Sequence, residues 1–176
     1  MPALLALLLA CGTGTIESTV DEDDGSGRLD TGAVDAALCI NELMPDNQGA
    51  LVEDDATPDW VELYNAEFET VSLVGWTLQL DGLEPVPLDA LGALEATEPL
   101  LLFAAGIDDV REGQLPFTLD ATGGALTLTG PNGTGQRIVY GVVQTNHAVA
   151  RETDCCEGPE CLVFTRTGTP GEENGG

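Results

Sequence analysis

The chain has 176 residues, enough for one domain of ordinary size with additional segments, and its 22 Gly and 10 Pro predict many turns. Acidic residues outnumber basic ones by 31 to 5, giving a net charge of −26. All five basic residues are Arg, which argues against lysine-dependent chemistry, and so negative a chain repels nucleic-acid phosphates.

The first ten residues form an apolar leader. They are too few to span a bilayer, which takes about 20 residues, but they match the apolar region of a signal peptide. Leu8-Leu9-Ala10-Cys11 resembles the lipobox of bacterial lipoprotein signals. The resemblance implies cleavage after residue 10 and lipid attachment to Cys11. Because Gly12 follows, with no Asp, the same analogy predicts export to the cell envelope and placement at the outer membrane.

Residues 11–36 are predicted to be a flexible acidic linker. Asp and Glu lie here among Gly, Ser and Thr, with few apolar side chains whose burial would offset the entropy of ordering. The acidic run at residues 21–25 superficially resembles a calcium loop, but its Gly comes one position too early. The expected organisation is therefore a signal peptide at 1–10, this linker, and one domain at 37–174.

Four cysteines remain once Cys11 is assigned to lipid, an even number that suits an exported protein with disulfides. A bond between the neighbours Cys155 and Cys156 would be strained. We therefore expect Cys161 to pair with one of them and Cys39 with the other, with both choices open. A metal site that uses this cluster and His147 is the alternative, although the Cys-x-x-Cys spacing of zinc sites is missing.

The first predicted strand of the domain spans residues 38–44 and ends before Pro45. Leu38 and Ile40 share one face of the strand by its period of two, so Cys39 points the other way. This placement predicts a disulfide at the surface.

The second predicted strand, residues 59–65, is amphipathic. Val61 and Leu63 share one face, and Trp60, Glu62 and Tyr64 share the other. Core packing is the expected role of a strand Trp, for Trp60 and for Trp76 alike, with a glycan-binding platform as the alternative if they are exposed.

Further strands follow at short, regular intervals. A turn at residues 131–133 predicts a hairpin between its flanking strands. Several antiparallel strands at such spacing indicate an all-β sandwich or barrel. The remaining predicted strands are residues 71–80, 100–104, 117–119, 125–129, 136–143 and 162–164.

Four motifs in this order are similar to the lamin tail domain family, and the similarity covers about residues 36–174. The resemblance implies an immunoglobulin-like β-sandwich and a non-catalytic interaction module, of a kind found in exported bacterial proteins. The motifs are Ile40-Asn41-Glu42, Trp60-Val61-Glu62-Leu63-Tyr64-Asn65, Leu73-Val74-Gly75-Trp76-Thr77-Leu78 and Gly168-Thr169-Pro170-Gly171-Glu172-Glu173-Asn174.

Candidate catalytic residues are few. His147 is the only His, and a Ser-His-Asp arrangement would require it to meet Ser72, so a strand-end role is the expected one. Glu42 and Glu62 are a possible carboxylate pair for a hydrolase. With 31 acids in the chain, such a pair arises easily, and we expect these side chains to accept hydrogen bonds from loop backbone or an Arg at the sandwich edge.

The loop from Asp46 to Asp59 contains five acids, which would suit a hard cation such as Ca²⁺. Their spacing matches no known ligand pattern, and a solvated loop is the expected structure. The sequence thus predicts a lipid-anchored binding or structural module that needs no cofactor and no metal. Its partner would be a protein or a glycan. A calcium-dependent adhesion or surface-layer component is the first alternative, and a hydrolase is the second.

Overall fold

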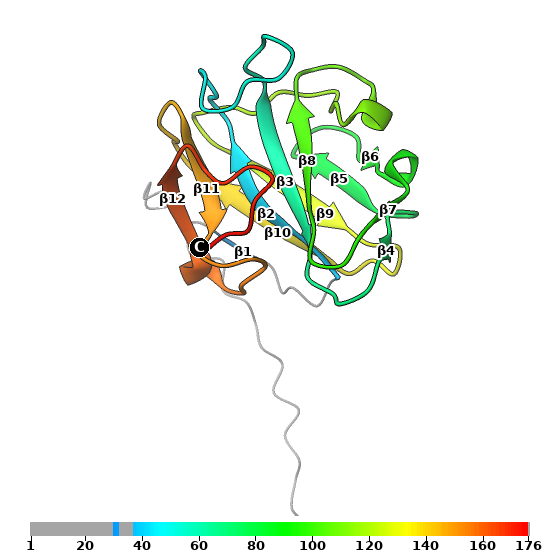
Figure 1. Cartoon of the computed structure of the whole chain (residues 1–176). Helices are drawn as coiled ribbons and strands as arrows, with labels where there is room; N and C mark the ends of the chain where they lie inside the picture. The colour runs from blue at the N-terminus through cyan, green and yellow to red at the C-terminus, as the bar shows by residue number, and fades with distance from the viewer. Residues whose placement is uncertain (1–29, 32–36, 176) are drawn as a thin grey trace, which may run out of the picture.

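The computed structural model describes residues 30–31 and 37–175. The predicted signal peptide, Cys11 and all of the predicted linker except residues 30–31 lie outside the described residues. The described chain is an all-β sandwich with two five-stranded antiparallel sheets (Figure 1). Sheet A has the order β1 (Asp30–Thr31), β10 (Gly135–Tyr140), β9 (Gly124–Thr129), β5 (Thr77–Leu80), β6 (Val86–Pro87). Sheet B has the order β12 (Leu162–Arg166), β11 (His147–Arg151), β2 (Leu38–Met44), β3 (Asp59–Asn65), β8 (Pro99–Ala104).

The described residues also form smaller elements outside the two main sheets. Two short strands pair with each other outside the main sheets, and three 3₁₀ helices lie in the connections. They are β4 (Val71–Ser72), β7 (Ala93–Leu94), η1 (Asp89–Leu91), η2 (Val110–Glu112) and η3 (Pro159–Cys161).

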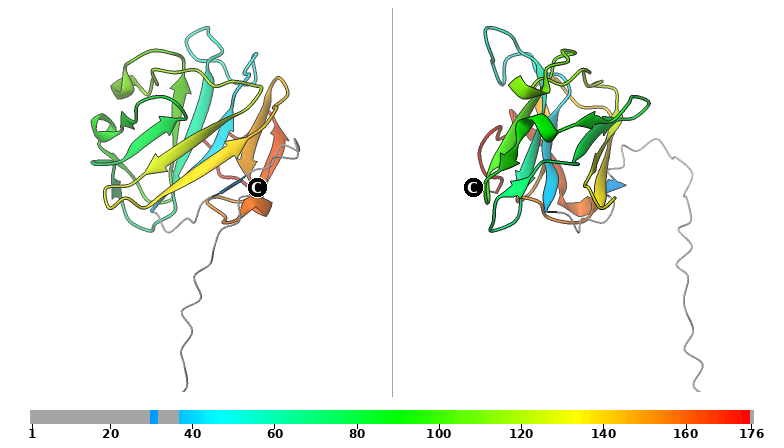
Figure 2. Two further views of the ribbon diagram at one scale, coloured as in Figure 1. Left: turned by 180° about the vertical axis from the view of Figure 1, so that it is seen from behind. Right: turned by 90° about the vertical axis from the view of Figure 1, so that its right-hand side faces the viewer.

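The main core lies between the two sheets, which form separate layers in the edge-on view of Figure 2. Ile40 and Leu63 from sheet B pack in one buried cluster with Leu78, Leu126 and Ile138 from sheet A. The alternation of apolar and polar residues in each strand directs these side chains inward.

A second, smaller cluster lies on the outer face of sheet B. Met44, Trp60 and Ala148 are fully buried there and form a cluster separate from the main core. Trp76 belongs to the main core. Both tryptophans are therefore packed inside the molecule, and the glycan platform that exposed tryptophans would form is not present.

Several predicted strands have different limits in the structure. Residues 71–80 are not one strand: the chain turns at Gly75, where φ is +81°, so β4 and β5 join different sheets. Gly is required at that turn, because an added Cβ would lie 2.9 Å from the Cβ of Pro131. Residues 117–119 pack into the core without forming a strand. The strand predicted at 136–143 ends at Tyr140, and β11 was not predicted.

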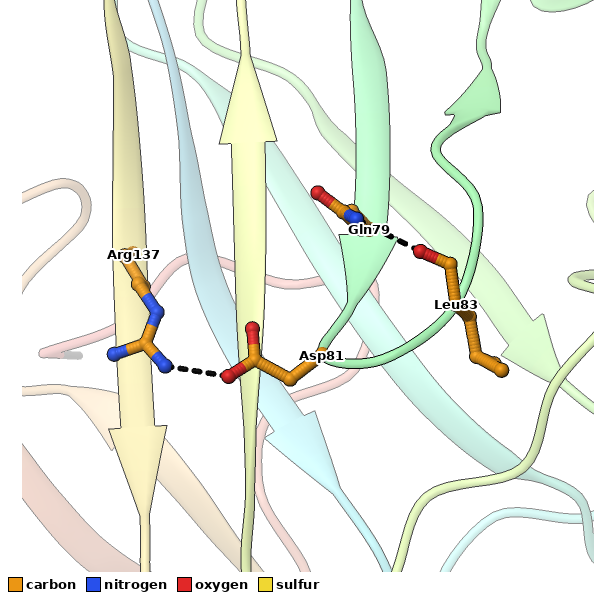
Figure 3. Close-up of polar contacts among 4 residues, drawn as sticks. All are labelled: Gln79, Asp81, Leu83 and Arg137. Atoms are coloured by element: carbon orange, nitrogen blue, oxygen red, sulfur yellow. Dashed lines mark hydrogen bonds and ion pairs between the residues drawn. The ribbon is translucent and has the colours of Figure 1, made fainter.

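Each sheet also makes contacts outside the main core. On sheet B, β8 is covered by a loop, because the Phe103 backbone bonds to Gly113 and Leu115 at 2.7 Å each. On sheet A, Arg137 of β10 reaches across the central strand β9 to Asp81 at 2.5 Å, and Gln79 of β5 bonds to the Leu83 carbonyl (Figure 3). The Arg137–Asp81 pair is half exposed, so we expect it to contribute at most about 1 kcal/mol.

Candidate functional site

A β-bulge in β2 places two polar side chains on the outer face of sheet B. The register of β2 against β3 shifts between Ile40 and Glu42, so Ile40 and Leu43 both face the main core although they are three residues apart. A bulge adds one residue and re-aims its neighbours. Asn41 and Glu42 consequently both point outward, and Glu42 lies directly opposite Glu62 of β3.

The C-terminal segment, residues 167–175, crosses this outer face and bonds to both carboxylates (Figure 1, red). One oxygen of Glu42 accepts hydrogen bonds from the Thr169 backbone N–H at 2.9 Å and from its hydroxyl at 3.2 Å. One oxygen of Glu62 accepts the Gly171 N–H at 2.7 Å. We call these four residues the carboxylate latch.

Asn41 extends the latch to a third acid. Its amide nitrogen donates to Glu62 at 3.0 Å and to Asp154 at 2.9 Å, and its amide oxygen accepts the Cys155 N–H. Asp154 in turn accepts the backbone N–H of Asn174 at 2.9 Å. The two ends of the domain sequence are thus held together by side chains from three of the four motifs noted in the sequence.

Gly168 brings the C-terminal segment close to Glu42. Its φ is +64°, a conformation that favours Gly, and an added Cβ would collide with the Glu42 carboxyl and lie 3.0 Å from the Trp60 ring. The backbone therefore lies directly over the side chains that it covers, and Glu42, Glu62 and Asn41 are all 0% exposed.

Burial sets the protonation of the two glutamates. It raises the pKa of Glu42 to about 7, against the hydrogen bonds from Thr169 and with a further increase from the charge of Glu62. Burial likewise raises the pKa of Glu62, while bonds from Asn41 and Gly171 lower it and Asp154 raises it. The second oxygen of Glu42 has no hydrogen-bond partner among the described residues, which also disfavours its ionised form.

The structure therefore brings the predicted carboxylate pair together and covers it. Three of the four oxygens accept bonds from backbone or amide groups of the chain itself. The expected hydrogen bonds from loop backbone are present. The expected alternative acceptor role, toward an Arg, is not seen at either glutamate in the described residues. Groups arranged in this way fix a chain segment, whereas acid–base chemistry needs contact with a substrate.

The cysteines confirm one expected pairing. Cys39 of β2 is bonded to Cys155, with Cα atoms 5.6 Å apart and 116 residues apart in sequence. The expected surface position is wrong, because Cys39 is fully buried: it faces outward but lies beneath the loop that carries Cys155. The remaining two cysteines, Cys156 and Cys161, are free thiols, so the second expected bond is not formed in this structure.

The residues considered for the alternative metal site do not come together in the structure. Cys155 is in the disulfide, and His147 begins β11 while the thiols lie beyond its other end. The structure has no group of three or more His, Cys, Asp or Glu side chains that could hold a metal ion within residues 30–31 and 37–175.

The acidic loop at residues 46–59 is organised by Asn47, which sequence reasoning missed. Its amide donates to the Leu51 and Pro58 carbonyls at 2.7 and 2.9 Å, and its oxygen accepts the N–H groups of Gly49 and Leu51. Asp59 accepts the Asn47 N–H, and burial raises the pKa of Asp59. Asn-centred bonds of this kind define a turn without a cation.

His147 and Ser72 do not meet. His147 lies at the start of β11 in sheet B, where its ring contacts the Thr145 carbonyl at 3.0 Å. Ser72 lies in β4 and accepts the Val74 N–H. These strands are on opposite sides of the molecule in both figures (Figures 1 and 2), so the Ser-His-Asp arrangement is not formed.

Other motif residues and one missed residue support the fold. Asn65 is fully buried and donates to the carbonyls of Glu69, Leu94 and Glu95, which holds two loops against β3. Gln136, which sequence reasoning missed, accepts the Ile40 N–H at 2.6 Å across the core. The available signal was the period of two in β10, which puts Gln136 on the same face as the core residues Ile138 and Tyr140.

No model of a known protein family matches the chain, and no curated protein sequence matches it. Within its described residues, the structure contains no helix that is long and apolar enough to cross a membrane.

Proposed function

We propose that this chain is an exported, lipid-anchored and non-catalytic binding or structural module built on a lamin-tail-like, immunoglobulin-like domain. The carboxylate latch carries the proposal. Glu42, Glu62 and Thr169–Gly171 come from separate family-like motifs and contact one another on the outer face of sheet B. Fixing the C-terminal segment is the role that accounts for their burial and for their partners.

The Cys39–Cys155 disulfide is compatible with an exported protein, because such bonds persist in oxidising compartments. The finer part of the proposal is attachment of lipid to Cys11 at the outer membrane, with the acidic segment before β1 as a tether. It is supported by the lipobox-like Leu8-Leu9-Ala10-Cys11 and by Gly12.

The net charge of −26 restricts the kind of surface that the domain can bind. Charge complementarity favours a protein or glycan surface that carries positive charge, and it disfavours phosphate-rich or acidic surfaces. We propose that such a surface, presented at the cell envelope, is what the domain contacts.

Intact mass of the full chain, expressed in a Gram-negative host and extracted from its membranes, tests this proposal. We expect a mature chain that starts at Cys11 and carries the added mass of a diacylglyceryl group. The matched control, Cys11→Ser, should be neither lipidated nor retained in the membrane fraction. An unprocessed chain in the soluble fraction, equal for both proteins, would contradict the anchor and leave only the latched domain.

A further inference from the structure

Arg151, at the end of β11, is a buried cation without a carboxylate partner. It is 1% exposed; its Nε donates to the Ile40 carbonyl at 2.9 Å, and Nη1 donates to the Cys156 carbonyl. Nη2 has no partner among the described residues, and the only ion pair in that part of the chain joins Arg137 and Asp81. A buried charge is costly unless an opposite charge or full hydrogen bonding compensates it.

The ionisable groups whose charge acts most on this cation are the thiols of Cys156 and Cys161, followed by Glu157. Cys156 follows β11, and Cys161 ends η3 directly before β12. The Cys156 sulfur lies 3.8 Å from the Cys161 carbonyl oxygen, and the Cys161 sulfur lies 3.0 Å from the Glu157 carbonyl oxygen. Both side chains are partly exposed, in contrast to fully buried Cys39. A soluble reagent can therefore reach this pair of thiols.

The two thiols are electrostatically unequal. Burial raises the pKa of Cys156, but hydrogen bonds from Cys161 and Thr153 and the charge of Arg151 outweigh it, so this pKa lies below its usual value. The pKa of Cys161 is raised to about 11, first by its hydrogen bond to Cys156, then by burial and by the charges of Cys156 and Glu160, while Arg151 lowers it. A thiol of lowered pKa beside a thiol of raised pKa is the arrangement that thiol–disulfide exchange uses.

We propose that Cys156 and Cys161 form a thiol–disulfide exchange site beside Arg151, in which Cys156 attacks a disulfide and Cys161 resolves the product. The Cys156 thiolate attacks one sulfur of a disulfide R–S–S–R, forms a mixed disulfide and expels RS⁻. Cys161 then loses its proton and attacks the Cys156 sulfur, which forms the Cys156–Cys161 bond and expels the second RS⁻. The pair loses two electrons and two protons, and the disulfide becomes two thiols.

Closure of this bond acts on the edge of sheet B. Cys161 directly precedes β12, and the Cys161 carbonyl accepts the Glu152 N–H at 2.8 Å. An oxidised pair ties the start of β12 to the loop that the Cys39–Cys155 bond already holds. It also removes the ionisable Cys156 thiol, whose charge acts on buried Arg151. The site therefore couples the thiol state of the surroundings to the outermost strand of the sheet.

The test uses the full chain and glutathione as the probe. After mild reduction and alkylation of the native protein, peptide mapping should find label at Cys156 and Cys161 and none at Cys39 or Cys155. In a second sample, glutathione disulfide added after the mild reductant is removed and before alkylation should abolish both labels and produce a linked Cys156–Cys161 peptide. Two persistent free thiols, two separate glutathione adducts, or equal opening of the Cys39–Cys155 bond would each overturn the proposal.

Two single variants separate the roles. Cys161→Ser should stop at a stable mixed disulfide between glutathione and Cys156. Cys156→Ser, its matched control, should react at Cys161 at least roughly tenfold more slowly, because burial and the charge of Glu160 still hold the pKa of Cys161 above its usual value. Equal rates in the two variants would contradict the assigned order of attack. Both variants should have the same thermal unfolding midpoint as the wild type in which Cys156 and Cys161 are thiols and the Cys39–Cys155 bond is intact. An unchanged midpoint would show that a difference in rate does not come from a folding defect.

Discussion

Glu42 combines full burial, one oxygen without a partner among the described residues, and a second glutamate directly opposite. Its pKa of about 7 in the folded state exceeds the usual 4.5 because burial disfavours the carboxylate. The folded state therefore binds more protons than the unfolded state between these two values. The stabilisation that comes from protonated Glu42 is therefore fully present below pH 4.5 and is lost as the pH rises from 4.5 through about 7.

We predict that the free energy of unfolding falls by about 3 kcal/mol between pH 4.5 and pH 8 because of Glu42 alone. Urea denaturation across this range measures the decrease. Glu42→Gln, which cannot ionise, should remove that part of the slope.

Asp81→Asn is the matched control, because it removes an acid that is half exposed and paired only with Arg137. It should keep the part of the decrease that belongs to Glu42. If Glu42→Gln keeps the wild-type slope, the assigned protonation of Glu42 is wrong.

In the C-terminal segment, two glycines let the backbone pass over the side chains of sheet B. Gly168 and Gly171 both have positive φ, +64° and +80°, so each disfavours any other residue. They differ in surroundings: an added Cβ at Gly168 collides with Glu42, whereas at Gly171 nothing lies within 4 Å.

We therefore predict that Gly171→Ala costs about 1 kcal/mol of unfolding free energy, from backbone conformation alone. Gly168→Ala should cost roughly 3 kcal/mol or more, because Glu42 and Trp60 must also move. Chemical denaturation of the two variants measures the difference. Equal effects would mean that the segment does not lie against Glu42.

Alternation of side chains made the longer strands predictable, but it failed wherever the chain departs from a period of two. The limits of β2, β3 and β8 match the sequence closely because apolar and turn-forming residues mark their ends. The bulge at Asn41 breaks the period within β2, and the turn at Gly75 divides what looked like one strand.

The latch was recognisable only in part from sequence. Glu42 and Glu62 were singled out by motif, and their acceptance of backbone N–H groups was expected. Their partners at Thr169 and Gly171 lie more than 100 residues away, so no local pattern connects them. Arg151 was missed for the same reason: its contacts are set by the loop that holds Cys155 and Cys156.

At the scale of the whole molecule, the Cys39–Cys155 bond and the latch hold the same face of sheet B. The disulfide closes a loop of 116 residues between β2 and the segment after β11. The latch ties the end of the chain to β2 and β3. Both constraints oppose the self-repulsion expected from a net charge of −26.

We predict that the double variant Cys39→Ala, Cys155→Ala loses about 5 kcal/mol of unfolding free energy, mainly through the larger entropy of its unfolded chain. A loss of this size approaches the whole stability of a small domain. The double variant Cys156→Ser, Cys161→Ser is the control and should lose less than about 1 kcal/mol, because these two thiols are free and close no loop in the structure. Urea denaturation of both proteins checks the prediction, and similar losses would contradict it.

The most direct test of the account is native-state hydrogen exchange at the Thr169 and Gly171 amides, whose only acceptors among the described residues are Glu42 and Glu62. We predict that both amides are protected in the wild type. In Glu62→Ala, Gly171 should exchange much faster while the Val61 amide of β3 stays protected. Rapid exchange of both amides in the wild type would show that the C-terminal segment leaves the carboxylates open to solvent, and it would contradict the structural role on which the proposed function depends.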